Sequence, residues 1–432
     1  MANVPPASAV VNRYAGRVRF DVLEEHLEEV DFLFAQRALL LTSQRHTLSD
    51  LDASEQRLLA HLDGLLAGEA EAYKLLLPKF VQGEGGEVFA VAYTVLATAD
   101  AAWLELLARM YFDNAQGPVL DGLCAALRLV PHSANVTAVV APWFTAARAP
   151  LRAAALDVLG FRRDPAVMPL VRALLDDPEP AVRAAACVAA GQLRDYSLRE
   201  RVERELSASD DALRRAALRS AMLLGSTLVL DQCRAAVQRH AAEADEADEA
   251  LRLLGYAGQA VDLPRVLAAL SEETLVSAAL AALGWMGNVA AIETLLDYAG
   301  HPQHLFQVAQ SFQRITGVDF GAEQLLSASS AAPAAQADSA RGGASADETA
   351  LPNPDKLAVW WSAHAAQFPA EQRLLHGQPF TLGGMLLLLE QAALAQRGEI
   401  ALALALMDAA LPHIESTAFA VVQRTQCAAC GV

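Results

Sequence analysis

The chain has 432 residues, a formal net charge of −18 and 54% hydrophobic residues, few of them aromatic. Such an acidic chain is a poor candidate for binding nucleic acid or anionic membranes, because both interactions rely on basic surfaces. Alanine and leucine, which favour helices, supply most of the apolar character, whereas the alternating β-branched and aromatic runs of strands are scarce. We therefore expect an all-α protein with no nucleic-acid partner and no membrane insertion.

Residues 1–116 are predicted to form a helical cap region at the N-terminal end of a repeat array. Apolar residues recur at helical spacing, as in Leu23, Leu27, Val30 and Phe34, and we expect the glutamates between them to face water. A stack of helical repeats needs such a cover because its end repeat would otherwise expose its apolar face.

His61 and Asp63 form the most enzyme-like pair in the cap region. Residues two apart on a helix point in different directions, so these two side chains cannot share one site. We interpret residues 61–64 as the end of a helix that stops at Gly64.

Residues 117–325 are predicted to form an α-solenoid of helix pairs. Similar segments start at Leu151, Val182 and Leu213, each 31 residues after the one before, and a further copy starts at Leu275. Each copy carries two adjacent alanines, which let neighbouring helices approach closely. We expect Gly160, Gly191 and Gly284 to mark the ends of the first helices, and residues 166–175 to form a second helix behind an Asp164–Pro165 start.

Three arginines, Arg152, Arg183 and Arg214, hold the same place in three repeats and form a ladder. In one interpretation each guanidinium bonds a carbonyl or an acid in the adjoining turn; the candidate acids are Asp164, Asp177, Asp195 and Asp210. In the other, the ladder faces outward and grips an acidic partner. Residues 148–219 contain 13 arginines against 11 acidic residues, so the strip is nearly neutral rather than strongly basic.

The remaining segments are a flexible linker at 326–350 and a small C-terminal helical unit at 351–432. Within the unit, Trp360 and Trp361 either anchor its core or form a hot spot for a partner. Cys427 and Cys430 are interpreted as part of a frayed tail, with a redox or metal role as the alternative. The acidic run at 243–249 is interpreted as a solvated loop or helix face, with binding of a basic partner as the alternative.

Location is predicted from what the sequence lacks. Residues 1–20 contain prolines and arginines instead of the apolar core of a secretion signal, and the apolar stretch at 382–389 is too short to span a bilayer. Five scattered cysteines suit a reducing compartment. We expect a cytoplasmic protein.

The pattern D-x-x-x-x-V-R-x-A-A at residues 177–186 resembles HEAT repeats, in particular the short class also seen in phycobilisome-lyase-like proteins. The flanking segments LEEHLEEVDFLFAQR, from Leu23, and LPNPDKLAVWWSAHAAQF, from Leu351, resemble a largely uncharacterised bacterial family of HEAT-repeat proteins often encoded near type VI secretion components. This resemblance implies protein partners, such as a secretion component or effector, and supplies no catalytic residues.

No phosphate-binding glycine loop, H-E-x-x-H or G-x-S-x-G motif occurs in the sequence. We therefore predict no catalytic, metal or cofactor-binding residues, no cofactor and no enzymatic activity. The function predicted is a protein-binding scaffold or adaptor associated with type VI secretion components or their effectors. The alternatives are an immunity or chaperone protein for a secreted effector and, from another class, a lyase or chromophore-handling enzyme.

Overall fold

Helices form nearly all of the regular structure, as the alanine- and leucine-rich composition predicts. The computed structural model describes residues 19–430 except 84, 99, 115, 132, 165–166, 240–243, 328–350 and 409–410. These described residues fall into two compact units. Unit 1 takes its residues from 1–226, 390–401 and 408–432, and unit 2 takes its residues from 227–389 and 402–407.

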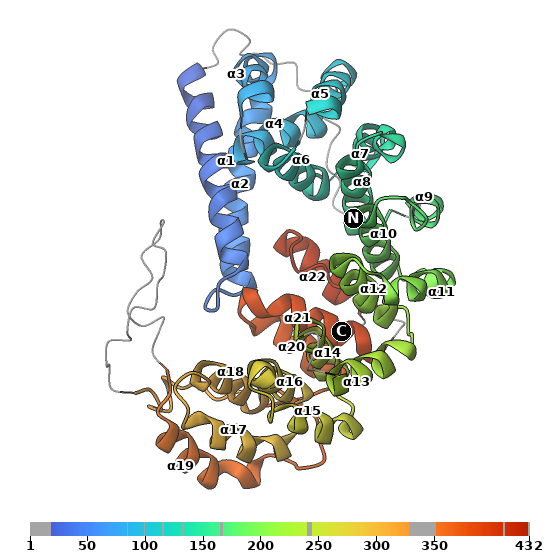
Figure 1. The fold of residues 1–432 in the computed structure, drawn as a ribbon. Coiled ribbons are helices and arrows are strands. Elements are labelled where there is room, and N and C mark those ends of the chain that lie inside the picture. Colours follow the sequence, from blue (N-terminus) through green and yellow to red (C-terminus); the bar gives the residue numbers. More distant parts are fainter. Residues whose placement is uncertain are drawn as a thin grey trace. The chain divides into compact units, whose positions relative to one another are not determined.

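Unit 1 contains the N-terminal helices, the repeats with the clearest 31-residue period and the last helix (Figure 1). Its helices are α1 (Phe20–Leu41), α2 (Leu48–Ala67), α3 (Glu69–Gln82), α4 (Gly85–Thr98), α5 (Ala101–Asn114), α6 (Pro118–Leu129), α7 (Ser133–Val140), η2 (Ala141–Thr145), α8 (Ala149–Arg162), α9 (Met168–Leu174), α10 (Pro180–Leu193), η4 (Tyr196–Leu198), α11 (Arg199–Glu203), η5 (Arg204–Ser207), α12 (Asp211–Leu223) and α22 (Ala420–Ala428).

Unit 2 contains the later repeats and a short hairpin. Its elements are α13 (Leu228–Arg239), α14 (Ala244–Ala257), η6 (Ala260–Asp262), α15 (Leu263–Ala269), η7 (Glu273–Leu275), α16 (Val276–Met286), η8 (Val289–Ala291), α17 (Ile292–Ala299), α18 (Leu305–Thr316), α19 (Pro354–His364), η10 (Ala365–Gln367), antiparallel β1 (Leu374–Leu375) and β2 (Gln378–Pro379), and most of α20 (Leu382–Gln391). Helix α21 (Leu394–Met407) contributes residues to both units.

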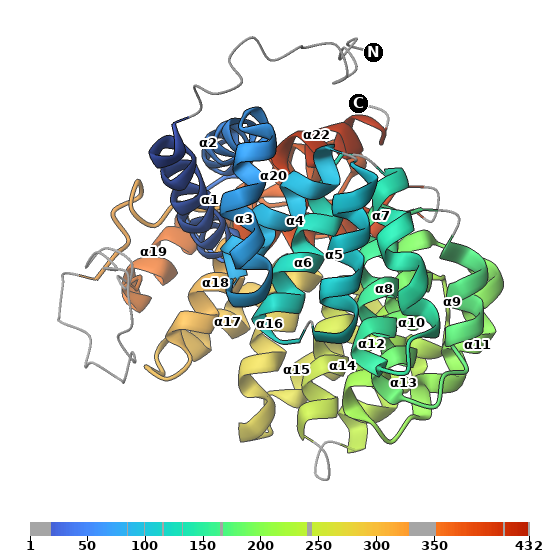
Figure 2. The same ribbon diagram turned by 90° about the horizontal axis from the view of Figure 1, so that it is seen from above.

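The first helices of successive repeats stack on one another. In unit 1, α4, α6, α8, α10 and α12 pack in sequence, and α9 and α11 lie along one side of that row (Figure 1 and Figure 2). In unit 2, α14, α16 and α18 form the equivalent row. The second alanine of each pair, such as Ala155, Ala186 and Ala279, is fully buried in these stacks. The all-α solenoid predicted from the repeats is confirmed.

Three glycines expected at helix ends lie inside the helices instead. A Cβ on Gly191 would lie 3.1 Å from the Ser220 backbone on the next stacked helix, and one on Gly284 would lie 2.8 Å from the Ser311 backbone. Gly160 faces Ala189 in the same way. The prediction that these glycines end helices is therefore wrong. They are small because stacked backbones approach closely there.

The helix ends come three residues after these glycines. Arg163 and Arg194 adopt left-handed backbone conformations with φ of 51°, and Gly287 has φ of 63°. Such a residue turns the chain and lets the following amides bond the last carbonyls of the helix. The amide of Asp164, for example, donates to the Leu159 carbonyl at 3.2 Å.

The hairpin of unit 2 lies over the left-handed turns of its stacked helices. The Leu374 amide donates to the Gly287 carbonyl at 2.9 Å. Arg373 donates to the carbonyls of Tyr256 and Trp285, each at 2.9 Å, near the C-terminal ends of α14 and α16. Its guanidinium lies 3.7 Å from the centre of the Phe380 ring, and burial lowers its pKa to about 10. A cation at this position suits the negative ends of the helix dipoles.

Several other expected boundaries differ from the structure. Helix α2 passes through Gly64 and ends at Ala67, so the predicted stop at Gly64 is wrong. The second helix of the Asp164 repeat is the shorter α9, and residues 165–166 lie outside the described residues. Residues 244–249 of the acidic run begin α14, so the run is helical rather than a loop, and Glu249 at its end is buried instead of solvated.

The C-terminal region distributes its described residues over both units and includes the β1–β2 hairpin. The expected flexible linker lies outside the described residues except for Leu326 and Ser327. Leu326 forms an isolated antiparallel bridge with Pro352. The predicted boundaries at 116, 325 and 350 stay predictions.

Candidate functional site

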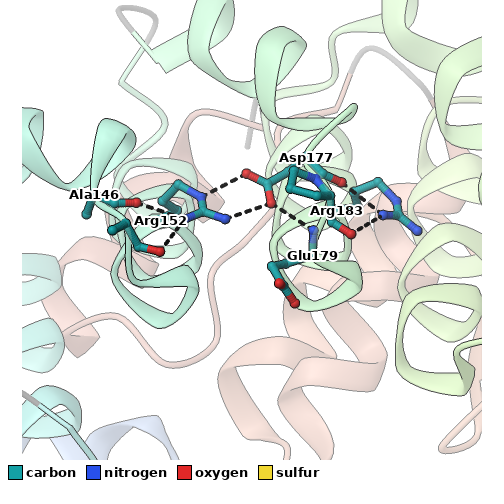
Figure 3. Close-up of polar contacts among 7 residues, drawn as sticks. Ala146, Arg152, Asp177, Glu179 and Arg183 are labelled. Atoms are coloured by element: carbon teal, nitrogen blue, oxygen red, sulfur yellow. Dashed lines mark hydrogen bonds and ion pairs between the residues drawn. The ribbon is translucent and has the colours of Figure 1, made fainter.

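The first arginine of the ladder joins two repeats. Arg152, on α8, donates through Nε and Nη2 to the two carboxylate oxygens of Asp177, both at 2.8 Å (Figure 3). Its Nη1 also donates to the carbonyls of Ala146 at 2.8 Å and Ala147 at 3.1 Å. Asp177 lies in the turn before α10, so this bidentate ion pair links α8 to the start of the next repeat.

The second arginine continues from the same aspartate. Arg183, on α10, donates through Nη1 to the carbonyl of Asp177 at 2.9 Å and to that of Pro178 at 3.2 Å (Figure 3). Its Nε forms an ion pair with Glu205 at 3.2 Å. Asp177 thus receives one arginine on its side chain and the next on its backbone.

The third arginine repeats the backbone contact. Arg214, on α12, donates to the carbonyl of Ala208 at 2.8 Å and to the carboxylate of Asp211 at 2.8 Å. Each arginine of the ladder therefore bonds the carbonyl six residues before it, at Ala146, Asp177 and Ala208. This regularity explains why arginine recurs near a helix start, where the helix dipole alone disfavours a cation.

The four carboxylates expected to pair with the ladder divide between different roles. Asp177 pairs with Arg152, whereas Asp210 caps α12 by accepting from the Leu213 amide at 2.9 Å. Asp195 caps η4 through the Ser197 amide at 3.1 Å, and Asp164 accepts from the Thr137 hydroxyl at 3.2 Å. Glu205 and Asp211, which were not among the candidates, pair with Arg183 and Arg214 instead.

The ion pair changes the titration of Asp177. Hydrogen bonds from Arg152 lower the pKa of this carboxyl, with a further contribution from the Glu179 amide, and they outweigh the opposing effect of burial. A carboxyl whose pKa is lowered by folding stabilises the fold above its unfolded pKa of about 3.9. That contribution is lost as the pH falls below this value. The contacts of the ladder are internal, and its role toward a partner stays a prediction.

The two tryptophans occupy different environments on α19. Trp361 is buried, and its Nε1 donates to Glu293 at 3.0 Å. Trp360 is half-buried, stacks on His364 with ring centres 4.4 Å apart, and donates to Glu323 at 3.2 Å. Trp361 therefore belongs to the interior of unit 2, and a partner role for Trp360 stays a prediction.

Cys427 and Cys430 do not lie in a frayed tail. Cys427 is in the last turn of α22 and Cys430 follows it in a buried position, because this helix packs on α2. Both are free thiols, and burial is the main cause that raises the pKa of each. A raised pKa leaves less of the reactive thiolate at neutral pH.

A buried ion pair between α1 and α2, which sequence patterns do not predict, holds the start of α22. Arg37 donates to Glu55 at 2.7 Å and to the Thr417 carbonyl at 2.7 Å, and the other oxygen of Glu55 accepts from the Ala420 amide at 2.7 Å. Burial raises the pKa of Glu55, although Arg37 opposes that shift. Residues 365 positions apart carry no local pattern that could predict this contact.

An acidic pocket was missed as well. Its volume is about 250 Å³, and its lining combines two leucines and one lysine with four acids: Glu24, Leu27, Glu28, Asp31, Leu75, Lys79 and Glu87. Lys79 pairs with Glu87 at 2.5 Å. Burial raises the pKa of Asp31, and the charge of Glu87 adds to that effect. The alternation of glutamates and leucines on α1 contained this feature but was interpreted only as a solvated face.

Metal-binding groups and membrane-spanning helices are both absent from the described ranges. No group of three or more histidine, cysteine, aspartate or glutamate side chains is placed to hold a metal ion there. No described helix combines the length and apolarity needed to cross a bilayer.

Comparison with known proteins identifies part of the array. Residues 139–223 match the family described as HEAT repeats, and these residues run from α7 to α12. No protein of curated function matches the chain. Among solved structures, human deoxyhypusine hydroxylase in complex with glycerol is 18% identical; the match covers 67% of this chain and 94% of that one, with a TM-score of 0.21. A TM-score this low carries no argument about activity.

Proposed function

We propose that this chain, whose residues 139–223 are HEAT repeats, is a protein-binding scaffold or adaptor. The observation that supports this function best is the stack of α8, α10 and α12, whose repeats are joined by the ion pairs of Arg152 with Asp177 and of Arg183 with Glu205. Repeats that contact only their neighbours form extended surfaces suited to holding other proteins. Because the ladder arginines are engaged internally, we place the partner surface elsewhere.

We propose that the partner presents a basic segment. The chain carries a net charge of −18, and the acidic pocket on α1, α3 and α4 has the size of one long side chain. Opposite charge speeds the encounter of two proteins and excludes partners of like charge. A lysine or arginine side chain fits the combination of apolar and acidic lining residues.

We propose, more narrowly, that the partner is a type VI secretion component or effector. This narrower role rests on the resemblance of the segments that begin at Leu23 and Leu351. The proposed function is binding rather than catalysis. The affinity purification described next also tests the alternative of a lyase or chromophore-handling enzyme.

The experiment is affinity purification of the tagged chain from its native host, followed by mass spectrometry and absorption spectroscopy. Wild type is compared with Glu28→Lys in the pocket and with Glu371→Lys, an exposed glutamate that controls for the change in charge. We expect one protein to be retained by wild type and Glu371→Lys and depleted at least tenfold with Glu28→Lys. No specific protein, or a reproducible bound chromophore, contradicts the scaffold. Equal retention by all three baits contradicts the pocket as the partner surface.

A further inference from the structure

Two histidines meet where α1 packs on α2. The Nδ1 atoms of His26 and His61 lie 3.0 Å apart, and their rings are inclined by 70° with centres 5.1 Å apart. The ring of His26 lies against Gly64, one turn beyond His61: a Cβ there would lie 2.5 Å from Cδ2 of that ring. Glycine at this position makes room for the histidine. The His26–His61 pair is therefore built into the packing of the two helices.

The contact sets a limit on how many protons the pair can hold. A bond between two Nδ1 atoms needs one N–H donor and one lone-pair acceptor. One additional proton can enter on the far nitrogen of the donor ring and leaves the bond intact. A second additional proton must occupy the accepting Nδ1, which then faces another N–H. Two like charges about 3 Å apart shift an equilibrium roughly tenfold even in water.

The groups around the pair do not neutralise a second charge. Burial and the charge of His61 lower the pKa of His26, and Glu25 on α1 opposes them. One turn along the two helices, Glu29 and Arg57 are already paired with each other, at 3.9 Å. On α4, Tyr93 has its pKa raised to about 12 by burial, so it stays neutral.

The remaining charged groups on the packed elements have partners of their own. On α3, Lys79 is paired with Glu87 of α4. On α22, Arg424 is paired with Asp52 of α2 at 2.5 Å. Asp63 is exposed on α2, where it acts on Tyr93.

We propose that the His26–His61 pair is a proton-operated joint that separates α1 from α2 when the pH falls from neutral to mildly acidic. This inference does not depend on the proposed scaffold function. Its consequence extends to α22, because α1 supplies Arg37 and α2 supplies Glu55 to the buried ion pair that holds the start of that helix. Loosening the α1–α2 contact therefore loosens the hold on α22.

The direction of the pH effect follows from the linkage between protonation and folding. A histidine whose pKa is lowered by folding binds protons less readily in the folded than in the unfolded state, so acid favours the open state. The stabilising contribution is complete above the unfolded pKa of about 6.5 and is lost as the pH falls below it. The raised pKa of Glu55 works in the opposite direction, so the test compares variants that share Glu55.

Hydrogen exchange of the full chain, followed by mass spectrometry of peptides from α1 and α2, tests the joint. Wild type is compared at equal pH with His61→Gln, which stays neutral and can still bond His26, and with His301→Gln, which removes an exposed histidine of unit 2. At pH 5.0 we expect α1 and α2 to exchange roughly tenfold faster in wild type and His301→Gln than in His61→Gln. At pH 7.5 the three should agree within about twofold.

Equal exchange of wild type and His61→Gln at pH 5.0 overturns the proposal. A difference in exchange between wild type and His61→Gln that is the same at pH 5.0 and pH 7.5 also overturns the proposal, because it would arise from altered packing and not from protonation. Gly64→Ala provides a second test, since its Cβ displaces the ring of His26 without removing a titratable group. We expect it to exchange faster at both pH values but to lose the extra acceleration at pH 5.0; retention of that acceleration contradicts the joint.

Discussion

The stacked helices of both units end in the same left-handed backbone turn, but two of these turns in unit 1 carry arginine in place of glycine. In unit 1 the left-handed positions are Arg163 after α8, Arg194 after α10 and Gly225 after α12, whereas in unit 2 they are Gly258, Gly287 and Gly317. Glycine is the usual choice because a side chain costs about 1 kcal/mol or more in this conformation. Arginine in unit 1 is therefore the exception that needs a reason.

The difference follows from what lies on each turn. In unit 2 the hairpin backbone lies directly on the turns, so that a Cβ on Gly287 would overlap the Leu374 carbonyl oxygen and one on Gly317 would overlap that of His376. In unit 1 the arginine at the turn reaches outward: Arg163 donates to the His413 carbonyl. The hairpin thus requires glycine at positions 287 and 317, whereas the open turn at Gly225 has glycine without such a cover.

The largest expected effect is that of Gly287→Ala in unit 2. It combines left-handed strain with displacement of the Leu374 backbone, so we expect a loss of about 3–4 kcal/mol in the free energy of unfolding. Gly225→Ala is the matched control, because Gly225 has φ of 71° and no atom within 4 Å of an added Cβ. Its loss should be about 1 kcal/mol. Equal losses, measured by urea unfolding, would mean that the hairpin does not press on the turn.

A smaller loss is expected from Gly284→Ala, which tests the stacking glycines. The added Cβ would lie 2.8 Å from the Ser311 backbone, and overpacking of this kind costs about 2 kcal/mol. Gly383→Ala, in α20, is the control because nothing lies within 4 Å of its Cβ. Alanine in an open helix position should leave stability unchanged or raise it by up to about 1 kcal/mol. A Gly284→Ala variant as stable as this control would mean that the contact with α18 does not require glycine at position 284.

The smallest expected effect is the difference in stability between two variants of Arg163, which separate its left-handed backbone strain from its bond to the His413 carbonyl. Arg163→Ala keeps the left-handed strain and loses the bond to His413, so we expect a loss of about 1–2 kcal/mol. Arg163→Gly loses the same bond but relieves the strain, and its loss should be smaller by about 1 kcal/mol. Thermal unfolding of the two variants measures this difference. If Arg163→Gly is as unstable as Arg163→Ala, left-handed strain at position 163 does not contribute to stability.

The sequence predicts features that recur and misses those that join distant segments. The 31-residue period and the alanine pairs predict the stacked helices, because the same close contact between neighbouring helices recurs in each repeat and buries the second alanine. The glycines were misassigned because a helix end and a close helix contact both favour a residue without a side chain. The turn arginines, three residues later, look like ordinary surface residues.

The polar contacts of the candidate site are likewise predictable only where they recur. The spacing of the ladder arginines predicts their equivalence, and bonding in the adjoining turn is one of its two interpretations; the structure adds that each arginine bonds the carbonyl six residues before it. The contact of Arg37 and Glu55 with α22, and that of His26 with His61, depend on tertiary packing. Their spacing in sequence is arbitrary, so no periodicity marks them.

Arg152 and Arg183 of the ladder join successive repeats through their ion pairs with Asp177 and Glu205. A double-mutant cycle of Arg152→Ala, Asp177→Ala and the combined variant, measured by urea unfolding at pH 7, tests it most directly. We expect a coupling free energy of about 2 kcal/mol, since both side chains are largely buried and bonded at two points. A coupling near zero, together with loss of the captured partner in Arg152→Ala, would show that this ion pair does not join the repeats and would identify the ladder as the binding site.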